Sequence, residues 1–333
     1  MRTLGAVGLV FVLAAGAVSG CGGRQDTADT DTGGDVTCQV SGETRVGIAT
    51  GNVGGVYYTM GNAFAEQVAT ATGGTVKATA AETGASVQNI QQLVAGTYAV
   101  AFSLADTAAD AVNGTGSFTA PQPVAALARI HTNYTQVIVR TSAGITDVAS
   151  MRGKRISTGS PKSGTEVIAN RLLKAAGLNA ETDIQAQRLD LTKTIDGIKD
   201  GSIDGFFWSG GLPTPNLTDL FTTSASSISF LDITPLLPAM RQFNPVYEQG
   251  AIPASAYRLP ADVPTIVVPN YLLVKNDLDA NVACALTKAL FDRKDQIAQA
   301  SPAAAELAVS NARNTAPVPL HRGAAEALSL LGG

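Results

Sequence analysis

Two glycine-rich segments contain the residues whose types and spacing are best suited to binding chemistry. They are "TGNVGGVYYTMG", Thr50 to Gly61, and "SPKSGTE", Ser160 to Glu166. Each follows a short apolar stretch typical of a strand and precedes an apolar repeat typical of a helix. The first turn of a helix offers unpaired N–H groups and the positive end of the helix dipole, which favours an anion. We therefore interpret both segments as anion-binding loops, with tight turns that only need glycine dihedrals as the alternative.

The first segment does not match the loops that bind nucleotides. It lacks the Lys-Ser/Thr ending of a P-loop, and Gly51, Gly54 and Gly55 do not have the G-x-G-x-x-G spacing. A carboxylate suits the same N–H groups, so it is the anion we expect. In the second segment Ser163 and Glu166 could equally form a capping box, which needs no ligand.

A third candidate is "GFFWSGG", Gly205 to Gly211, which contains the only tryptophan, Trp208. An aromatic side chain at a strand end before two glycines suits the apolar wall of a pocket, and core packing is the alternative. No cofactor is indicated.

Catalytic and metal-binding patterns are missing from the sequence. Gly-x-Ser-x-Gly does not occur, and Asp106 and Asp204 are isolated rather than paired. The distant His131 and His321 do not have metal-ligand spacing with the cysteines. We therefore predict binding without catalysis, so the protein is not expected to be an enzyme, and no metal site is predicted.

The elements that must position these loops alternate between strand and helix patterns. Predicted strands include Arg45–Thr50, Thr75–Ala80 and Tyr98–Phe102, then "VAALARI" and "TQVIVR" as two separate strands. Ser86 is predicted to cap a helix, and Asn281–Gln299 reads as one helix. The alternation predicts an α/β fold in which helices pack on parallel strands. Two such units predict two lobes, each a sheet flanked by helices, with a ligand cleft beyond the strand ends.

The N-terminus has the pattern of a processed leader. Leu4 to Ala17 is apolar but too short to span a bilayer, and "VSGC", Val18 to Cys21, resembles a bacterial lipobox. We predict a signal peptide over 1–20, lipidation of Cys21 and a flexible tether over 21–41. An ordinary secretory peptide with an incidental cysteine is the alternative.

Two cysteines remain outside this leader. Cys38 and Cys284 are expected to form a disulfide in an oxidising compartment, with two buried free thiols as the alternative.

The bulk composition narrows the classes of partner. The chain has 333 residues with 45% hydrophobic and 15% charged residues, which is typical of a globular protein. Its net charge is −4 and it contains no run of lysine or arginine. We therefore expect no nucleic-acid partner, and we expect a monomer.

Several motifs in order resemble one family from about residue 44 to the end. They are "ATGNVGGVYYTMG", "TGASVQNIQQL", "SMRGKRISTGSPKSGTE", "IKDGSIDGFFWSGGLPTP" and "VPLHRGA". The chain resembles the TAXI receptors, the solute-binding components of TRAP transporters. The resemblance implies a type II periplasmic-binding-protein fold, an extracytoplasmic location and delivery of ligand to a TRAP-type permease. The ligands it implies are small organic acids and amino acids such as glutamate, glutamine or 2-oxoglutarate.

Mapped onto this sequence, the resemblance implies contacts from both lobes, which we place at 42–130 plus 268–333 and at 131–267. The first-lobe contacts would be Thr50, Gly51, Asn52, Val53, Gly54 and Tyr57. The second-lobe contacts would be Ser163, Gly164, Thr165 and Trp208, with Gly210 and Gly211 shaping the wall. Arg129 is a candidate cation at the lobe junction, with a solvated surface arginine as the alternative.

Three departures from the family pattern affect the expected pocket. Val53 replaces a small or hydroxyl residue, Leu104-Ala105 replace Gln-Ser, and Lys162 replaces glycine. They lead to the hypothesis of a ligand with a carboxylate and a larger apolar part. A receptor for an ABC importer, a lipoprotein that presents ligand to a sensor kinase, and an enzyme on the same fold remain alternatives.

Overall fold

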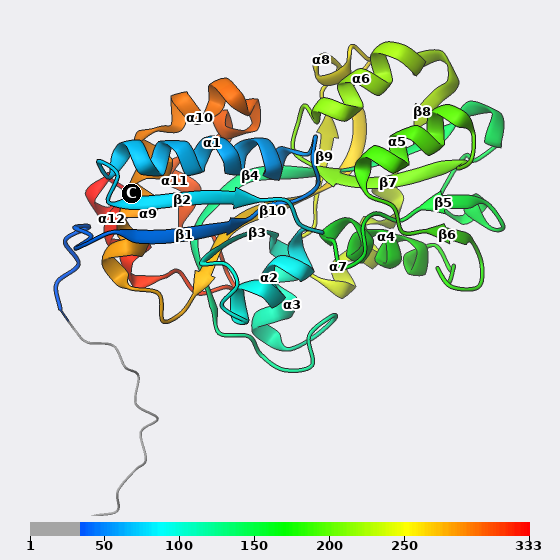
Figure 1. Cartoon of the computed structure of the whole chain (residues 1–333). Helices are drawn as coiled ribbons and strands as arrows, with labels where there is room; N and C mark the ends of the chain where they lie inside the picture. Colours follow the sequence, from blue (N-terminus) through cyan, green and yellow to red (C-terminus); the bar gives the residue numbers. More distant parts are fainter. Residues whose placement is uncertain (1–33) are drawn as a thin grey trace, which may run out of the picture. The chain divides into compact units, whose positions relative to one another are not determined.

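The computed structural model describes residues 34–333, which form a mixed α/β structure (Figure 1). The predicted signal peptide, Cys21 and the first part of the predicted tether lie outside the described residues. None of the described helices combines the length and the apolar character needed to cross a bilayer.

Ten strands form one sheet in the order β2-β1-β3-β10-β4-β7-β5-β6, with β8 paired to β4 and β9 to β10. Pairing is parallel among β1, β2 and β3 and among β5, β6 and β7, whereas β4 and β10 run antiparallel to their neighbours. The strands are β1 (Thr44–Ala49), β2 (Val76–Ala81), β3 (Val100–Leu104), β4 (Val124–Arg140), β5 (Arg155–Ser157), β6 (Gln185–Gln187), β7 (Gly205–Gly210), β8 (Ile228–Phe230), β9 (Glu248–Ile252) and β10 (Val263–Lys275).

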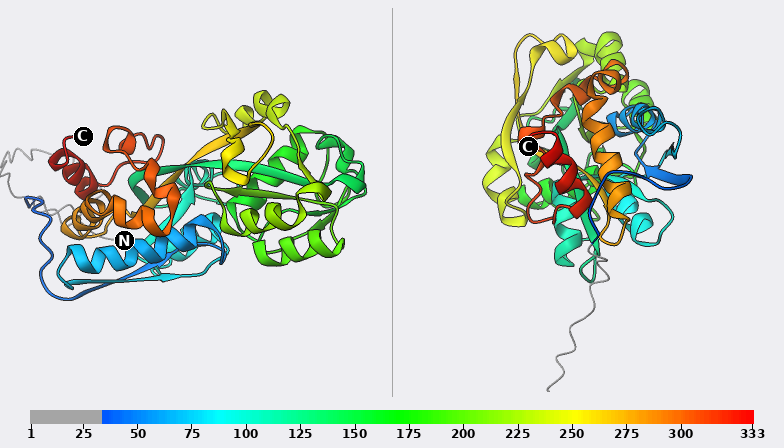
Figure 2. Two further views of the ribbon diagram at one scale, coloured as in Figure 1. Left: turned by 90° about the horizontal axis from the view of Figure 1, so that it is seen from above. Right: turned by 90° about the vertical axis from the view of Figure 1, so that its left-hand side faces the viewer.

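Helices cover the sheet, and the strands with their helices form two groups. We refer to β1–β3 with α1–α3 and α9–α12 as the first lobe, and to β5–β7 with α4–α8 as the second lobe (Figures 1 and 2). The helices are α1 (Val56–Ala71), α2 (Ser86–Val94), α3 (Ala105–Asn113), α4 (Gly164–Ala175), α5 (Leu191–Asp200), α6 (Pro215–Ser224), α7 (Leu237–Phe243), α8 (Ala254–Tyr257), α9 (Ala280–Asp292), α10 (Lys294–Ala300), α11 (Val309–Ala312) and α12 (Arg322–Leu330).

Two long strands belong to both lobes. The prediction of two separate strands before Arg140 is wrong, because "VAALARI" and "TQVIVR" are parts of the single 17-residue strand β4. The polar residues between them obscured this continuity, yet His131 and Asn133 are buried and the backbone there still pairs with β10. In β10 the register shifts between Pro269 and Tyr271, opposite this polar stretch.

The apolar core follows the same arrangement. One cluster around α1 and α9 includes Met60, Phe64 and Leu286, and another in the second lobe includes Phe206 and Leu220. A further cluster contains residues of both lobes, so the lobes also pack against each other.

The predicted helix Asn281–Gln299 is two helices, α9 and α10, separated at Arg293. Ile297 of α10 packs in the same cluster as Leu286 and Leu290 of α9. The apolar spacing therefore continues across the break, which is why the pattern predicted one helix.

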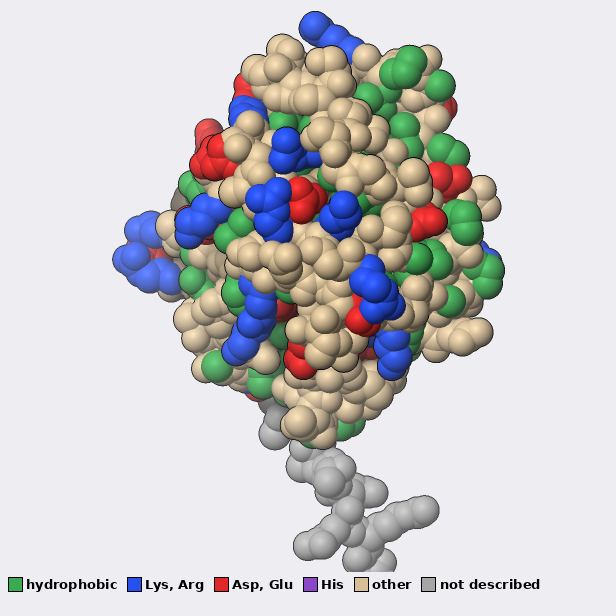
Figure 3. Space-filling view, turned by 90° about the vertical axis from the view of Figure 1, so that its right-hand side faces the viewer, with side chains coloured by type: hydrophobic (Ala, Val, Ile, Leu, Met, Phe, Trp, Pro, Cys, Tyr) green, Lys and Arg blue, Asp and Glu red, His purple; other side chains and the backbone are tan. Residues whose placement is uncertain are grey.

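The second lobe carries charges of both signs at the end beyond β5 and β6. Basic and acidic side chains are interspersed on this face (Figure 3). Ion pairs join Arg155 to Asp204 and Lys199 to Asp219. This face is therefore not uniformly basic.

A disulfide between Cys38 and Cys284 joins the described part of the predicted tether to α9, with 4.9 Å between the Cα atoms. The Thr37 amide also donates to the Asn281 side chain at 2.8 Å. Residues 37 and 38 are therefore held against the first lobe.

The double variant Cys38→Ser/Cys284→Ala is expected to lower the free energy of unfolding by about 2–4 kcal/mol, because the cross-link restricts the unfolded chain. Urea unfolding with and without dithiothreitol measures this effect. The reductant should destabilise the parent protein and leave the double variant unchanged. Equal stability of the oxidised and reduced parent protein would contradict the prediction.

Candidate ligand-binding site

A cavity of about 30 Å³ lies between the lobes, where three helices begin. Residues from both lobes and from β4 line it: Gly51, Asn52, Gly55, Val56, Tyr57, Ala85, Ser86, Leu104, Asn133, Ser163, Gly164, Thr165, Trp208, Ser209, Gly210 and Gly211. The free space suits a group of a few atoms, such as a carboxylate. A whole small acid needs the lobes to close slightly less tightly than in the described conformation.

Helix α1 begins at the first predicted loop. Its N-cap is Gly55, which has no side chain to accept from the first-turn N–H groups. The Gly55 amide itself donates to the Asn52 carbonyl at 3.0 Å, and Gly54 has a φ of 77°, which favours glycine. The loop thus directs the start of α1 at the cavity, where Val56 and Tyr57 belong to the lining.

Helix α4 begins at the second predicted loop. Ser163 caps it, as predicted, and accepts from the Glu166 amide at 2.9 Å. In a capping box the Glu166 side chain would accept from the backbone amide of Ser163. Here it accepts from the backbone amide of Lys162 at 2.7 Å instead. Gly164 and Thr165, whose N–H groups belong to the first turn and have no acceptor within the helix, both line the cavity.

A third helix N-terminus, that of α2, also reaches the cavity and was missed as a site element. The prediction that Ser86 caps this helix is wrong, because Ala85 is the N-cap and has no side-chain cap. The Ser86 hydroxyl instead accepts from the Leu104 amide at 3.1 Å and so holds α2 to β3. The motif "TGAS" before an apolar helical repeat was the available signal.

The remaining walls are mainly apolar. The indole N–H of Trp208 donates to the Thr214 hydroxyl at 3.1 Å, so the ring offers an apolar surface to the cavity. Leu104, one of the departures from the family pattern, adds to this surface. At Gly210 an added Cβ would lie 2.4 Å from the Trp208 indole nitrogen, so glycine is needed beside the ring.

Most of the predicted site residues meet at this cavity. Nine of them line it: Gly51, Asn52, Tyr57, Ser163, Gly164, Thr165, Trp208, Gly210 and Gly211.

Four predicted residues lie outside the lining. Thr50 is fully buried and its hydroxyl donates to the Ala81 carbonyl at 2.6 Å. Val53 is 45% exposed, and Gly54 packs against Asn216. Arg129 lies on β4 opposite Tyr271 of β10.

Polar side chains on β4, β7 and β10 complete the site, and sequence reasoning missed them. The Asn133 amide donates to the Ser209 hydroxyl at 2.6 Å, and both residues line the cavity. The Tyr57 hydroxyl donates to the Asn270 side chain, whose own amide donates to the His131 carbonyl at 3.1 Å.

Burial keeps the titratable groups of this region neutral. It raises the pKa of Tyr57 well above its ordinary value and lowers the pKa of His131. Among the described residues, none that lines the cavity is Asp, Glu, Lys or Arg. An anion in the cavity therefore depends on backbone N–H groups, helix dipoles and hydroxyls.

The two lobes touch at the rim of the cavity. The Ser160 hydroxyl donates to the side-chain oxygen of Asn52 at 2.9 Å. The backbone N–H of Gln88 donates to the backbone carbonyl of Lys162 at 3.1 Å. An added Cβ at Gly164 would lie 2.4 Å from Leu104. The described conformation is therefore closed around the cavity.

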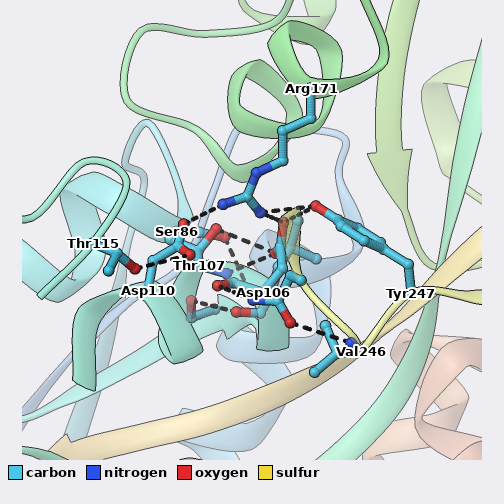
Figure 4. A network of polar contacts seen from close by, with 11 residues as sticks. Ser86, Asp106, Thr107, Asp110, Thr115, Arg171, Val246 and Tyr247 are labelled. Carbon is cyan, nitrogen blue, oxygen red and sulfur yellow. Dashed lines mark hydrogen bonds and ion pairs between the residues drawn. The ribbon is translucent and has the colours of Figure 1, made fainter. Parts of the chain in front are cut away.

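A buried ionic network joins α3 of the first lobe to α4 of the second (Figure 4). Arg171 donates to Asp106 and to the Tyr247 hydroxyl, both at 2.9 Å, and to Asp110 at 2.6 Å. Tyr247 also donates to Asp106. We call these four residues the interlobe latch.

The latch is largely shielded from water, since Arg171 is 12% exposed and Asp106 is fully buried. Burial raises the pKa of Asp110 even though Arg171 opposes that shift. Burial alone would lower the pKa of Arg171, but the neighbouring acidic groups raise it above its ordinary value. The latch therefore depends on pairing, because each charge would be costly to bury alone.

Two solved structures have similar folds. One is a protein from Bordetella bronchiseptica RB50, with a TM-score of 0.54, 19% identity, and coverage of 86% of this chain and 89% of that one. The other is the alkanesulfonate-binding protein SsuA from Xanthomonas axonopodis pv. citri bound to MOPS, with a TM-score of 0.50, 13% identity, and coverage of 87% and 85%. They support the two-lobe periplasmic-binding-protein fold predicted from the sequence.

A model of a protein family also matches the sequence of this chain. It covers residues 48–329, which include every helix and strand that lines the cavity. The chain therefore belongs to the NMT1-like family.

Proposed function

We propose that this protein is an extracytoplasmic solute receptor of the TAXI type, which captures a small carboxylate between two lobes and delivers it to a TRAP-type permease. The observation that carries the proposal is the meeting of three helix N-termini, from both lobes, at one cavity without charged side chains. Lipid attachment at Cys21 would hold the receptor at the membrane. The protein needs no cofactor and no catalytic step in this role.

The proposed lobes, 42–130 plus 268–333 and 131–267, meet where β4 and β10 cross from one group of helices to the other. Ligand binding would stabilise the closed arrangement, because the N-termini of α1 and α2 lie in one lobe and that of α4 in the other. The anion then links the lobes, and the closed form engages the permease.

An importer of the ABC type would use the same binding site. Because a sulfonate suits the same N–H groups, the fold likeness to an alkanesulfonate-binding protein makes sulfonates a necessary comparison. Uptake by cells that express the chain with a TRAP-type permease distinguishes the two systems. Uptake that requires an ATPase instead would contradict the TRAP assignment.

Titration calorimetry against dicarboxylates, amino acids, apolar monocarboxylates and alkanesulfonates is expected to identify carboxylates as the ligand class. Fluorescence of Trp208 provides a second signal, because its ring lines the cavity and should change environment on binding. Binding of sulfonates alone would overturn the carboxylate assignment. A fluorescence signal that no saturating ligand alters would exclude Trp208 from the site.

Gly164→Ala is expected to weaken ligand binding at least tenfold, because the new methyl group would occupy the contact with Leu104 and Ser86 and hold the lobes apart. Calorimetry measures the affinity, and thermal unfolding verifies that the lobes remain folded. The double variant Gly164→Ala/Leu104→Ala provides the matched control, since it removes the clash with Leu104 while the contact with Ser86 remains, and it should recover part of the affinity. A single variant that binds like the parent protein would refute the closure contact.

Arg171→Met is expected to open the unliganded receptor, because it leaves two buried carboxylates without a cation. Small-angle X-ray scattering should show a larger radius of gyration than that of the parent protein, and calorimetry a weaker affinity. Arg152→Met is the control, since it removes an exposed ion pair with Asp183 inside the second lobe. Equal radii for Arg171→Met and Arg152→Met would argue against the latch.

A further inference from the structure

We infer that Asn133 forms a subsite for a hydroxyl group, so that the receptor selects a hydroxy acid over the amino acid of the same skeleton. This inference rests on the proposed function and names its substrate class. It starts from a buried polar atom of the cavity lining that has no partner within the described residues.

Asn133 lies on β4, where this strand passes from one lobe to the other. Its side chain is 1% exposed and lines the cavity. The amide nitrogen donates to Ser209, but the oxygen Oδ1 has no hydrogen-bond partner among the described residues. A buried acceptor without a donor is destabilising, so a ligand that supplies the donor gains affinity at this point.

The N-termini of α1, α2 and α4 are the proposed binding point for the carboxylate of the ligand. They line the same cavity as Asn133, and the space between them is small. The carboxylate and the donor must therefore lie close together on the ligand, as they do in a 2-substituted acid. The apolar wall formed by Val56, Leu104 and Trp208 suits the rest of such a molecule.

An ammonium group fits this position poorly. Within residues 34–333 the lining includes no Asp or Glu, and two acids of the neighbouring helices have other partners. Asp106 pairs with Arg171, and Glu166 pairs with Arg188. A buried ammonium would lack a counter-charge and would face the positive ends of three helices.

A hydroxyl group meets the requirement in either orientation of the Asn133 amide. It donates to Oδ1 in the described orientation. If the amide rotates by half a turn, the same hydroxyl accepts from the nitrogen. An ammonium group can only donate, so a rotated amide would repel it.

Two matched ligand series test the inference by titration calorimetry on the full chain. The first compares propionate, lactate and alanine, and the second compares glutarate, 2-hydroxyglutarate and glutamate. In at least one series the hydroxy acid is expected to bind tenfold or more tightly than the unsubstituted acid, and more tightly than the amino acid. Amino acids that bind as tightly as the hydroxy acids, or unsubstituted acids that do, would overturn the inference while the carboxylate receptor stands. Absence of binding in both series would overturn the proposed function itself.

Two variants of Asn133 sharpen the test. Asn133→Val removes the acceptor and should shrink the preference for the hydroxy acid over the unsubstituted acid to less than threefold. Asn133→Asp adds a negative charge at nearly the same shape and should reverse the order, so that the amino acid binds more tightly than the hydroxy acid. Arg152→Met is the control, since it removes an exposed ion pair with Asp183 outside the cavity lining, and it should retain the preference. An unchanged preference in Asn133→Val would refute the subsite.

Discussion

The N–H groups in the first turn of every α-helix have no hydrogen-bond acceptor within the same helix. In this protein three helices begin at one largely buried point, and two of them, α1 and α2, have no side-chain cap there. The fold therefore concentrates unpaired donors and positive dipole ends at the junction of the lobes. Most features of the site, from the glycines of the first loop to the uncharged lining, follow from leaving that point free for a ligand.

Besides the apolar cluster that contains residues of both lobes, the contacts between the lobes divide into two kinds that differ in their physical basis. Those at the cavity rim are neutral hydrogen bonds and close packing at Gly164. Those of the interlobe latch are charged and buried, and they include Arg171, Asp106 and Asp110. Neutral contacts can form and break at low cost, whereas the latch must exchange its pairing for water when the lobes separate. In the proposed opening, the latch and the shared apolar cluster would together oppose separation, and the rim would set the fit around the ligand.

The fold and half of the site were predictable because their signals are local. Strand-loop-helix alternation predicted the α/β architecture, and the loops at Gly51 and Ser163 were found from glycine and capping patterns. The continuity of β4 was missed because its polar residues interrupt the apolar pattern while their backbone still pairs. Asn133 and Ser209 were missed for a related reason. Their roles depend on a contact between two strands where Asn133 is buried, and nothing in their immediate sequence indicates it.

The two strands that cross between the lobes have a mechanical consequence. β4 and β10 are hydrogen-bonded neighbours over most of their length, so the lobes are joined by a two-stranded ribbon rather than by independent linkers. Such a ribbon bends easily out of its plane and resists shear within it, because shear would break its hydrogen bonds. Pro269 and the register shift beside it provide a point where the ladder is already interrupted. We therefore expect the lobes to retain essentially one rotational degree of freedom, so that each opening and closing follows the same arc.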